Sequence, residues 1–496
     1  MWSDELHDPG TEINSFIAGD NGMVYLVRDH ASDHYSINTI SPTLQTDEEK
    51  DLVYEEKNQK LTVSDVFHLK NQLACIGFTA DNGKFNIVVF PIDPKTLEQT
   101  QPSQTVFSIE KRGGAYFYMK KYYSPLNGHT YNYAISPDQT KVVVYNKPEE
   151  DNANPYSIDV VVFDETLKKL WSKTIQVPVK EGKFILQNVV VDNSGNVYAA
   201  GLMDIPKTKS SPSNSYSLLL GIKDGAALQT SKLDLGGKMI TSLGLTFDKS
   251  NNLICAGFYS DKSMATTSGV YYLLMDAGLK SVKQQSKDIT DDLKNKMFEA
   301  SQRKDHDIPT LPLIYISVQD NGNLIFAGQH SSVSSYSTTI RTIMPTGAGQ
   351  TSTTSTTTPN ITFFASGVVV VNLDPDGQLK YFNLVPIAQK GPYPDYLGCA
   401  VQVYNGRVFV IYNDNPKNET VMNGYTLEYY DGTRGNSIVT MAAVNTDGSL
   451  EKFELISNKD LETTLVPKRS QTVADNKLLI YGDRVKNYKL GMIAFK

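Results

Sequence analysis

The sequence predicts an all-β protein, a single β-propeller of eight four-stranded blades. A hairpin pattern of two apolar runs around a tight turn occurs eight times along the 496 residues. Each hairpin is followed by a third apolar strand and then a more polar fourth strand, with no strong helical periodicity between units. Repeated antiparallel units of four strands are typical of propellers. A ring of seven blades, with the terminal pieces sharing one blade, is the alternative.

The clearest copy of the hairpin is Val189–Gly201. Three valines lead into Asp-Asn-Ser-Gly-Asn, and a second apolar run ends at Gly201. β-Branched runs around a turn whose Asn and Gly tolerate positive φ predict a β-hairpin. The eight turns are marked by Gly22, Asn71, Asp138, Gly195, Asn251, Gly322, Gly406 and Asn476.

The later strands of each unit follow the same logic. Ile158–Phe163 is an apolar third strand, and Leu170–Ile175 is a more polar fourth strand. The innermost strand is expected to be apolar and the outermost polar. The approximate blades are 13–60, 61–110, 130–178, 184–235, 239–287, 312–385, 397–456, and 470–496 together with 1–12.

The last unit ends after its third strand, Lys489–Phe495. We therefore expect the N-terminal residues 1–12, around Trp2 to Leu6, to supply its fourth strand and close the ring. A last blade with only three strands is the other possibility.

The best copies resemble bacterial β-propeller repeats with a Val-Asp-x-x-Gly-Asn-Val-Tyr-x-Ala-Gly core. They are Val191–Gly201, Phe247–Gly257 and Val318–Gly328. The resemblance extends loosely over essentially the whole chain. It implies the fold only, because propellers serve as binding, enzymatic and structural proteins alike.

Composition and charge exclude some classes of protein. A net charge of -7 argues against a nucleic-acid binder, which needs a dense basic surface. No apolar run approaches the roughly 18 residues of a membrane-spanning helix. Residues 1–6 lack the pattern of a signal peptide, and loops rich in Tyr, Ser and Thr favour a mature exported protein, periplasmic or on the cell surface, with a cytoplasmic protein as the alternative. Cys75, Cys255 and Cys399 are expected to be buried, unpaired thiols.

Four insertions predict where a partner binds. They are 111–129, 288–311, 329–366 and 413–436. In a propeller, the loops between strands two and three and between successive blades emerge on one face, and these insertions all belong to that face. The opposite face carries mainly tight turns. An elaborated face on a rigid scaffold is normally the binding face.

Aromatic and basic residues in these insertions are the candidate binding residues. Such side chains stack on sugars or anchor a protein partner. The Ser/Thr-rich segment 329–366 is expected to be a mobile loop, or a β-arm if it is partnered. The candidates are Arg112, Tyr116, Tyr118, Tyr122, Tyr123, Tyr393, Tyr396, Tyr425, Tyr429, Tyr430 and Arg434.

Signals for catalysis or metal binding are weak. Residues 291–300 read as a short amphipathic helix, followed by Asp305, His306 and Asp307. Three adjacent residues rarely converge on one ion, so we expect a solvated loop and no metal or cofactor. The other histidines form no pattern in the sequence, and no nucleophile or phosphate-binding motif is evident. Carboxylates contributed by different blades would escape a search by spacing.

Two hypotheses follow. The first is a non-catalytic binding scaffold that holds a protein partner in a cell-envelope or secreted assembly through the loop-rich face. The alternative is a carbohydrate-binding or carbohydrate-active propeller of the glycoside hydrolase or lyase type, with the tyrosines as sugar platforms. A glycan site needs a concave pocket, whereas a partner site is broad and flat with a polar rim.

Overall fold

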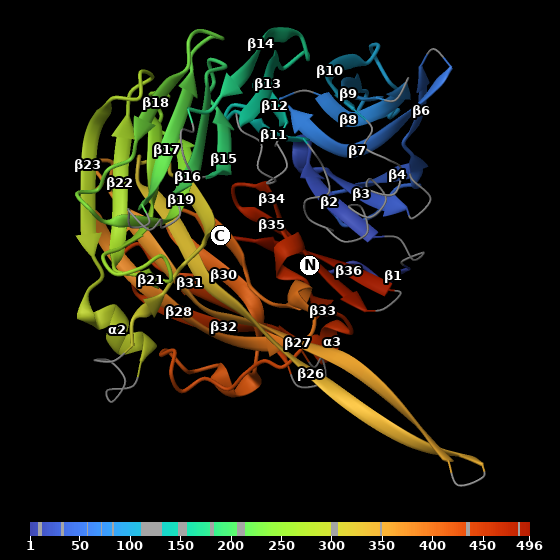
Figure 1. Ribbon diagram of the computed structural model, residues 1–496, viewed down its shortest axis with the longest axis vertical. Coiled ribbons are helices and arrows are strands. Elements are labelled where there is room, and N and C mark those ends of the chain that lie inside the picture. The colour runs from blue at the N-terminus through green and yellow to red at the C-terminus, as the bar shows by residue number, and fades with distance from the viewer. Residues whose placement is uncertain are drawn as a thin grey trace.

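A computed structural model shows an all-β propeller whose sheets follow one another around a ring (Figure 1). The short helix predicted within 291–300 is α2 (Asp291–Met297), and a second short helix is α3 (Asn458–Leu461). No helix in the part of the chain described is long and apolar enough to cross a membrane. The structure describes residues 1–7, 12–30, 34–56, 58–70, 72–81, 84–110, 131–146, 156–178, 183–205, 214–298, 306–347, 350–432, 437–484 and 487–496.

The first four blades follow the chain in order, each an antiparallel sheet with neighbouring strands paired. Blade two carries a fifth strand, because β6 turns back onto the start of β7. Blade one is β2 (Glu12–Ala18), β3 (Val24–His30), β4 (His34–Ile40) and β5 (Lys50–Asp51); blade two is β6 (Val53–Glu56), β7 (Gln59–Leu69), β8 (Gln72–Asp81), β9 (Lys84–Ile92) and β10 (Gln104–Glu110); blade three is β11 (Tyr131–Ile135), β12 (Lys141–Asn146), β13 (Ser157–Asp164) and β14 (Lys169–Gln176); blade four is β15 (Lys183–Val191), β16 (Val197–Ile205), β17 (Asn214–Ile222) and β18 (Gln229–Lys232).

The second half of the ring has the same plan, with a small extra sheet of β21 (Thr266–Thr267) and β24 (Ile308–Pro309) beside blade five. Blade eight also has five strands, since both β33 and β34 pair with β35. Blade five is β19 (Met239–Phe247), β20 (Leu253–Ser260), β22 (Gly269–Met275) and β23 (Ser281–Asp288); blade six is β25 (Leu313–Val318), β26 (Leu324–Gly347), β27 (Gln350–Leu373) and β28 (Leu379–Gly391); blade seven is β29 (Ala400–Tyr404), β30 (Arg407–Asp414), β31 (Ile438–Val444) and β32 (Leu450–Ser457); blade eight is β33 (Thr464–Leu465), β34 (Gln471–Ala474), β35 (Lys477–Arg484), β36 (Asn487–Ala494) and β1 (Leu6–His7).

The apolar core shows that the ring has eight blades and is closed. Among the described residues, buried side chains form one cluster between each pair of neighbouring blades, which makes eight such clusters. An open row of eight blades would have only seven such interfaces. The closing cluster joins blade one to blade eight and includes Leu26, Leu479 and Tyr488. The prediction of eight blades is confirmed, with the correction that blades two and eight have five strands.

The N-terminal segment completes the last blade, as predicted. Leu6 pairs with Tyr488 of β36, and Trp2 forms a bridge with Gly491. The backbone N–H of Ser3 donates to the Leu490 carbonyl over 2.8 Å. The outer edge of β36 is therefore covered by the first residues of the chain, and the two ends of the ring are fastened together.

The recurring turn has a clear local cause. In the hairpin of β15 and β16, the Asp192 carboxylate accepts hydrogen bonds from the backbone N–H groups of Ser194 and Asn196 at 2.9 and 2.8 Å. Gly195 has a φ of 86°, which favours glycine. Asp248 accepts the equivalent bonds in the hairpin of blade five. An aspartate at the start of the turn thus satisfies the backbone donors that the turn leaves free.

Burial follows the position of each strand in its blade. Every residue of β20, the second strand of blade five, is buried, whereas β23, the outermost strand, is largely exposed. The expected polar outer strand is correct, although burial is deepest in the second strand. Cys75 and Cys255 are buried free thiols, but Cys399 is partly exposed, which corrects the expectation for that residue.

Candidate functional site

The segment 329–366 forms a long β-arm on the loop-rich face. It consists of the outer parts of β26 and β27, paired from Ser331 with Ala365 to Gly347 with Gln350. The arm is the connection between strands two and three of blade six, and it extends well away from the ring (Figure 1). Of the two forms considered from the sequence, the segment takes the β-arm, because the two Ser/Thr-rich halves pair with each other.

The edges of the arm are open along most of its length. β28 pairs with β27 only as far as Phe363, opposite Gly391. Beyond that point, the described residues of β26 and β27 pair only with each other. Arg341 is the single charged residue in the sequence from 331 to 366. Charged side chains normally protect an exposed strand edge, so this edge is a suitable template for an added strand.

Apolar side chains are exposed on both faces of the arm. Val333 lies opposite Phe363, and Ser335 lies opposite Ile361, which places Val333, Ile361 and Phe363 on one face. Tyr336 lies on the other face, opposite Asn360. The exposed fractions of Val333, Tyr336 and Ile361 are 61%, 64% and 46%. Large apolar side chains that remain exposed to solvent are available for contact with a partner.

Aromatic side chains continue from the base of the arm onto the 415–432 loop of blade seven. The Phe364 and Tyr429 rings are 6.5 Å apart in an edge-to-face arrangement. The ammonium of Lys390 lies 4.9 Å from the centre of the Tyr429 ring. The backbone of Tyr430 bonds to β28 on both sides, donating to Ala388 and accepting from Lys390. The loop is therefore fixed against blade six.

A buried ion pair holds the other side of this loop. The Lys452 ammonium lies 3.3 Å from the Asp414 carboxylate and donates to the Asn418 carbonyl at 2.7 Å. The Asn418 side chain donates to Asp414 at 2.7 Å and to the Glu428 carbonyl. Burial raises the pKa of Asp414 and lowers that of Lys452, against the opposing effect of the pairing. These contacts keep the loop in one conformation and so preorganise the surface that it carries.

The predicted tyrosines divide into exposed and packed residues. The exposed fractions of Tyr393, Tyr429 and Tyr425 are 66%, 48% and 38%. Tyr396 is partly buried, and its hydroxyl donates to Asp483 at 2.7 Å. Tyr430 is buried against Ala365 and Leu397, which corrects its assignment to an exposed patch. Tyr393 packs edge-to-face on Tyr396, so this ring is positioned as well as exposed.

The structure describes only two of the remaining predicted residues, His306 and Asp307. His306 is described and stacks on Phe298 at 5.8 Å, and Asp307 accepts a hydrogen bond from Lys262. Each of these two side chains thus has a protein partner, and both residues are exposed. The residues outside the described part are Asp305, Arg112, Tyr116, Tyr118, Tyr122, Tyr123 and Arg434.

The apolar side chains of the arm itself were not predicted from the sequence. Val333, Tyr336, Ile361 and Phe364 lie among serines and threonines, so no hydrophobic periodicity marks them. Their alignment depends on which residue of β26 faces which residue of β27. The adjacent pair Phe363-Phe364 in an otherwise polar tract was the available signal.

A shallow, open polar hollow of about 580 Å³ lies where blade five leads into α2, on the same face. Its lining includes Lys238, Asp288 and Asp291. The Lys238 ammonium is 4.1 Å from the centre of the Tyr259 ring, and the Tyr259 hydroxyl donates to Asp288. That hydrogen bond, together with Lys238, lowers the pKa of Asp288. The hollow therefore presents a fixed carboxylate and an ammonium, which suit a ligand rich in hydroxyl groups.

Comparison with known proteins adds a general similarity to propellers. No protein-family model and no curated protein matches the sequence. Among solved structures, the WD40 domain of SCAP from fission yeast has 10% identity and a TM-score of 0.42, with 99% of this chain and 96% of that chain covered. Chaetomium thermophilum Sqt1, solved bound to the N-terminus of ribosomal protein L10, has 8% identity and a TM-score of 0.40, with 98% and 100% covered. The β-propeller domain of the Trilobed protease from Pyrococcus furiosus has 9% identity and a TM-score of 0.36, with 89% and 97% covered.

At these TM-scores and identities the similarities say nothing about function. The propeller assignment rests on the eight sheets and the eight clusters between them.

Proposed function

We propose that this protein is a non-catalytic binding scaffold that engages a protein partner through its loop-rich face, in a bacterial cell-envelope or secreted assembly. The observation that carries the proposal is the β-arm, whose two edges are open and whose side chains Val333, Tyr336 and Ile361 are exposed. The partner that fits is a polypeptide with an extended segment, because such a segment adds to an open edge through main-chain hydrogen bonds.

Charge and shape support a protein partner at this site. The arm has almost no charge, so it offers no attraction for a phosphate backbone or an acidic polymer. At its base the Phe364 ring packs edge-to-face on Tyr429, beside the Lys390 ammonium. Tyrosines with a polar rim are typical of interfaces in which a few residues supply most of the binding energy. Export is supported by the Tyr-, Ser- and Thr-rich composition.

Site-specific photo-crosslinking in the native organism tests the proposal. A photoreactive amino acid replaces Tyr336, and a matched protein carries it at Ser250, an exposed turn residue on the opposite face. We expect one protein species to be linked at position 336 and absent at position 250. Replacing residues 334–362 with a two-residue turn removes position 336, so this form is compared with the wild type by affinity pull-down without a crosslinker, where it should no longer retain that protein species.

The same samples are applied to a glycan array and analysed for bound polysaccharide. Equal capture of the protein species by the arm-shortened form, or crosslinks at both positions, would contradict the proposal. Polysaccharide retained without any protein would also contradict it.

Carbohydrate binding is the second candidate. It is favoured by the exposed rings of Tyr393 and Tyr425 and by the polar hollow lined by Lys238 and Asp288. An aromatic ring stacks on the apolar face of a sugar, while a carboxylate accepts from its hydroxyl groups. If the protein binds carbohydrate at these residues, its binding to the glycan array should persist when the arm is removed. Asp288→Asn should weaken that binding several-fold.

A further inference from the structure

Two histidines and an aspartate come together on blade one, in a place that the sequence spacing did not suggest. His30 is the last residue of β3 and His34 the first of β4, and the two are paired directly across the strands. Their rings are stacked, with centres 4.4 Å apart and planes 9° from parallel. Asp51 is paired with Ser36, two residues along β4 from His34, and so lies on the same side of the sheet.

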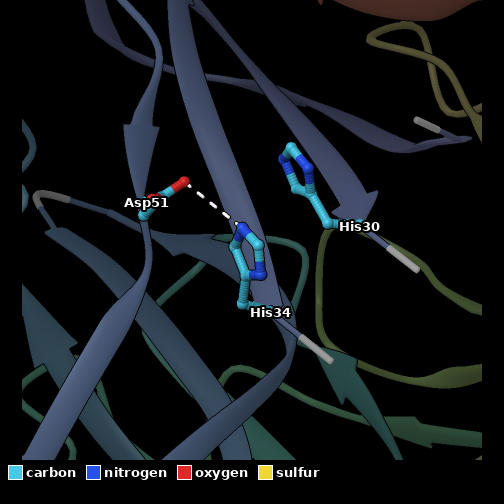
Figure 2. A group of neighbouring side chains, drawn as sticks. All are labelled: His30, His34 and Asp51. Carbon is cyan, nitrogen blue, oxygen red and sulfur yellow. Dashed lines mark ion pairs between the residues drawn. The ribbon is translucent and has the colours of Figure 1, made fainter. Parts of the chain in front are cut away.

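The distances between donor atoms suit a metal ion. One donor atom from each of the three side chains lies within 4.8 Å of the other two. The His34 Nε2 and the Asp51 carboxylate oxygen are 3.4 Å apart, and Figure 2 shows these two groups turned towards each other with the His30 ring beside them. Tetrahedral zinc with bonds of about 2.0–2.1 Å has ligand atoms about 3.4 Å apart. The His34 nitrogen and the Asp51 oxygen are thus already as far apart as two ligands of one zinc ion.

The remaining adjustment is small. Because the two imidazole planes are almost parallel, their lone pairs do not yet point to one position. Rotation of a ring about its Cβ–Cγ bond corrects this, and that torsion is broad in histidine. Both rings are partly exposed, at 20% and 24% of their side-chain area, so space is available for the rotation.

The surroundings of His30 resemble the outer shell of a metal site. Its Nε2 lies 2.7 Å from the Ser36 hydroxyl and 3.1 Å from the Glu49 carboxylate. Glu49 also faces Arg28, which is held in turn by the Tyr488 hydroxyl at 2.6 Å. A carboxylate that bonds to one nitrogen of an imidazole orients the ring and leaves the other nitrogen to the metal. His30 would then coordinate through Nδ1.

We propose that His30, His34 and Asp51 form a binding site for a divalent transition-metal cation of the zinc class. Two imidazole nitrogens and one carboxylate oxygen suit Zn²⁺ better than Mg²⁺ or Ca²⁺, which prefer oxygen alone. Three protein ligands leave at least one position for water or for a donor from a partner. His30 and His34 lie at the same face of the ring as the β-arm, since the end of β3 and the start of β4 correspond to the ends of the second and third strands from which the arm extends in blade six.

Calorimetric titration with ZnCl₂ tests the site, on protein freed of any histidine tag. The wild-type protein should bind one equivalent, and His34→Ala and Asp51→Asn should each weaken that binding about ten-fold or more. His306→Ala is the matched control, because His306 is an exposed histidine outside the cluster, and it should bind as the wild type does. Zinc should raise the melting temperature of the wild type and of the control, but not of the two cluster variants.

The melting temperatures without zinc check that each variant is folded, which is expected because the Asp51 side chain is 63% exposed. Absence of zinc binding by the wild type overturns the proposal. Undiminished binding by both cluster variants, or equal loss in the His306→Ala control, also overturns it, because either result places the ion elsewhere. None of these outcomes depends on the arm or on its partner.

Discussion

Replacing Trp2 by alanine tests how the ring is closed. The Trp2 ring is partly buried between blades seven and eight and lies over Gly491 of β36. A half-buried tryptophan removes about 100 Å² of apolar surface from water, and at about 25 cal/mol per Å² this corresponds to about 2.5 kcal/mol. We expect Trp2→Ala to lower the free energy of unfolding by about that amount.

The shift in melting temperature will be small because the protein is large. Unfolding entropy of about 2.1 cal/mol/K per residue gives about 1 kcal/mol/K for a chain of this length, so the expected decrease is about 2–3 °C by differential scanning calorimetry. Hydrogen exchange should quicken at Leu490 and Met492, whose amides bond to residues 1–3. Asp4→Ala, an exposed change in the same segment, should alter the melting temperature by less than 1 °C.

A second substitution, Gly491→Ala, tests the contact between Trp2 and β36. A Cβ at Gly491 would lie 2.5 Å from Trp2 Cζ3 and 2.8 Å from Ile480 Cγ1, so Gly491→Ala should displace the indole ring. In a double-mutant cycle, the Gly491→Ala change should be less destabilising when Trp2 is already alanine, with a coupling of about 1–2 kcal/mol. Strictly additive effects of the two substitutions would show that Trp2 does not close the ring in this way. A Trp2→Ala protein with the melting temperature of the wild type would show the same.

Three further predictions follow from buried polar groups. Burial raises the pKa of Asp65 from 3.8 to about 6, so the stability that this group contributes is complete below pH 3.8 and is lost as the pH rises through 6. The free energy of unfolding of Asp65→Asn, measured in urea, should therefore rise by about 2 kcal/mol relative to that of the wild type between pH 4.5 and 7.5. A constant difference between the two proteins over this range would contradict this. Lys452→Ala leaves the Asp414 carboxylate buried without its cation, and should lower the free energy of unfolding by about 3–5 kcal/mol. The double variant with Lys452→Met and Asp414→Asn should recover most of that loss. Cys75 and Cys255 should resist a thiol reagent until the protein unfolds, because burial raises the pKa of both; rapid labelling of either would show an opened blade.

Local rules allowed the repeat to be predicted from the sequence. An aspartate, a glycine or asparagine with positive φ and two flanking apolar runs satisfy a tight turn wherever they occur, as at Asp192 and Gly195. Eight such signals, and a last unit with one strand too few, sufficed to predict eight blades closed by the N-terminal residues. Strands β6 and β33 were not predicted, because they are short and pair through positions that carry no pattern of their own.

The candidate sites depended on contacts between distant residues. Tyr429 and Tyr430 are adjacent in sequence, yet one is exposed and the other buried, because β28 pairs with the backbone at that point. The histidines at 30 and 34 form no pattern in the sequence, but the pairing of β3 with β4 places them opposite each other, and the fourth strand brings in Asp51. The sequence alone therefore determined the repeated unit and its number, since these depend on neighbours along the chain. Tertiary structure decided which side chains meet at the surface, since that depends on the register between strands far apart in sequence.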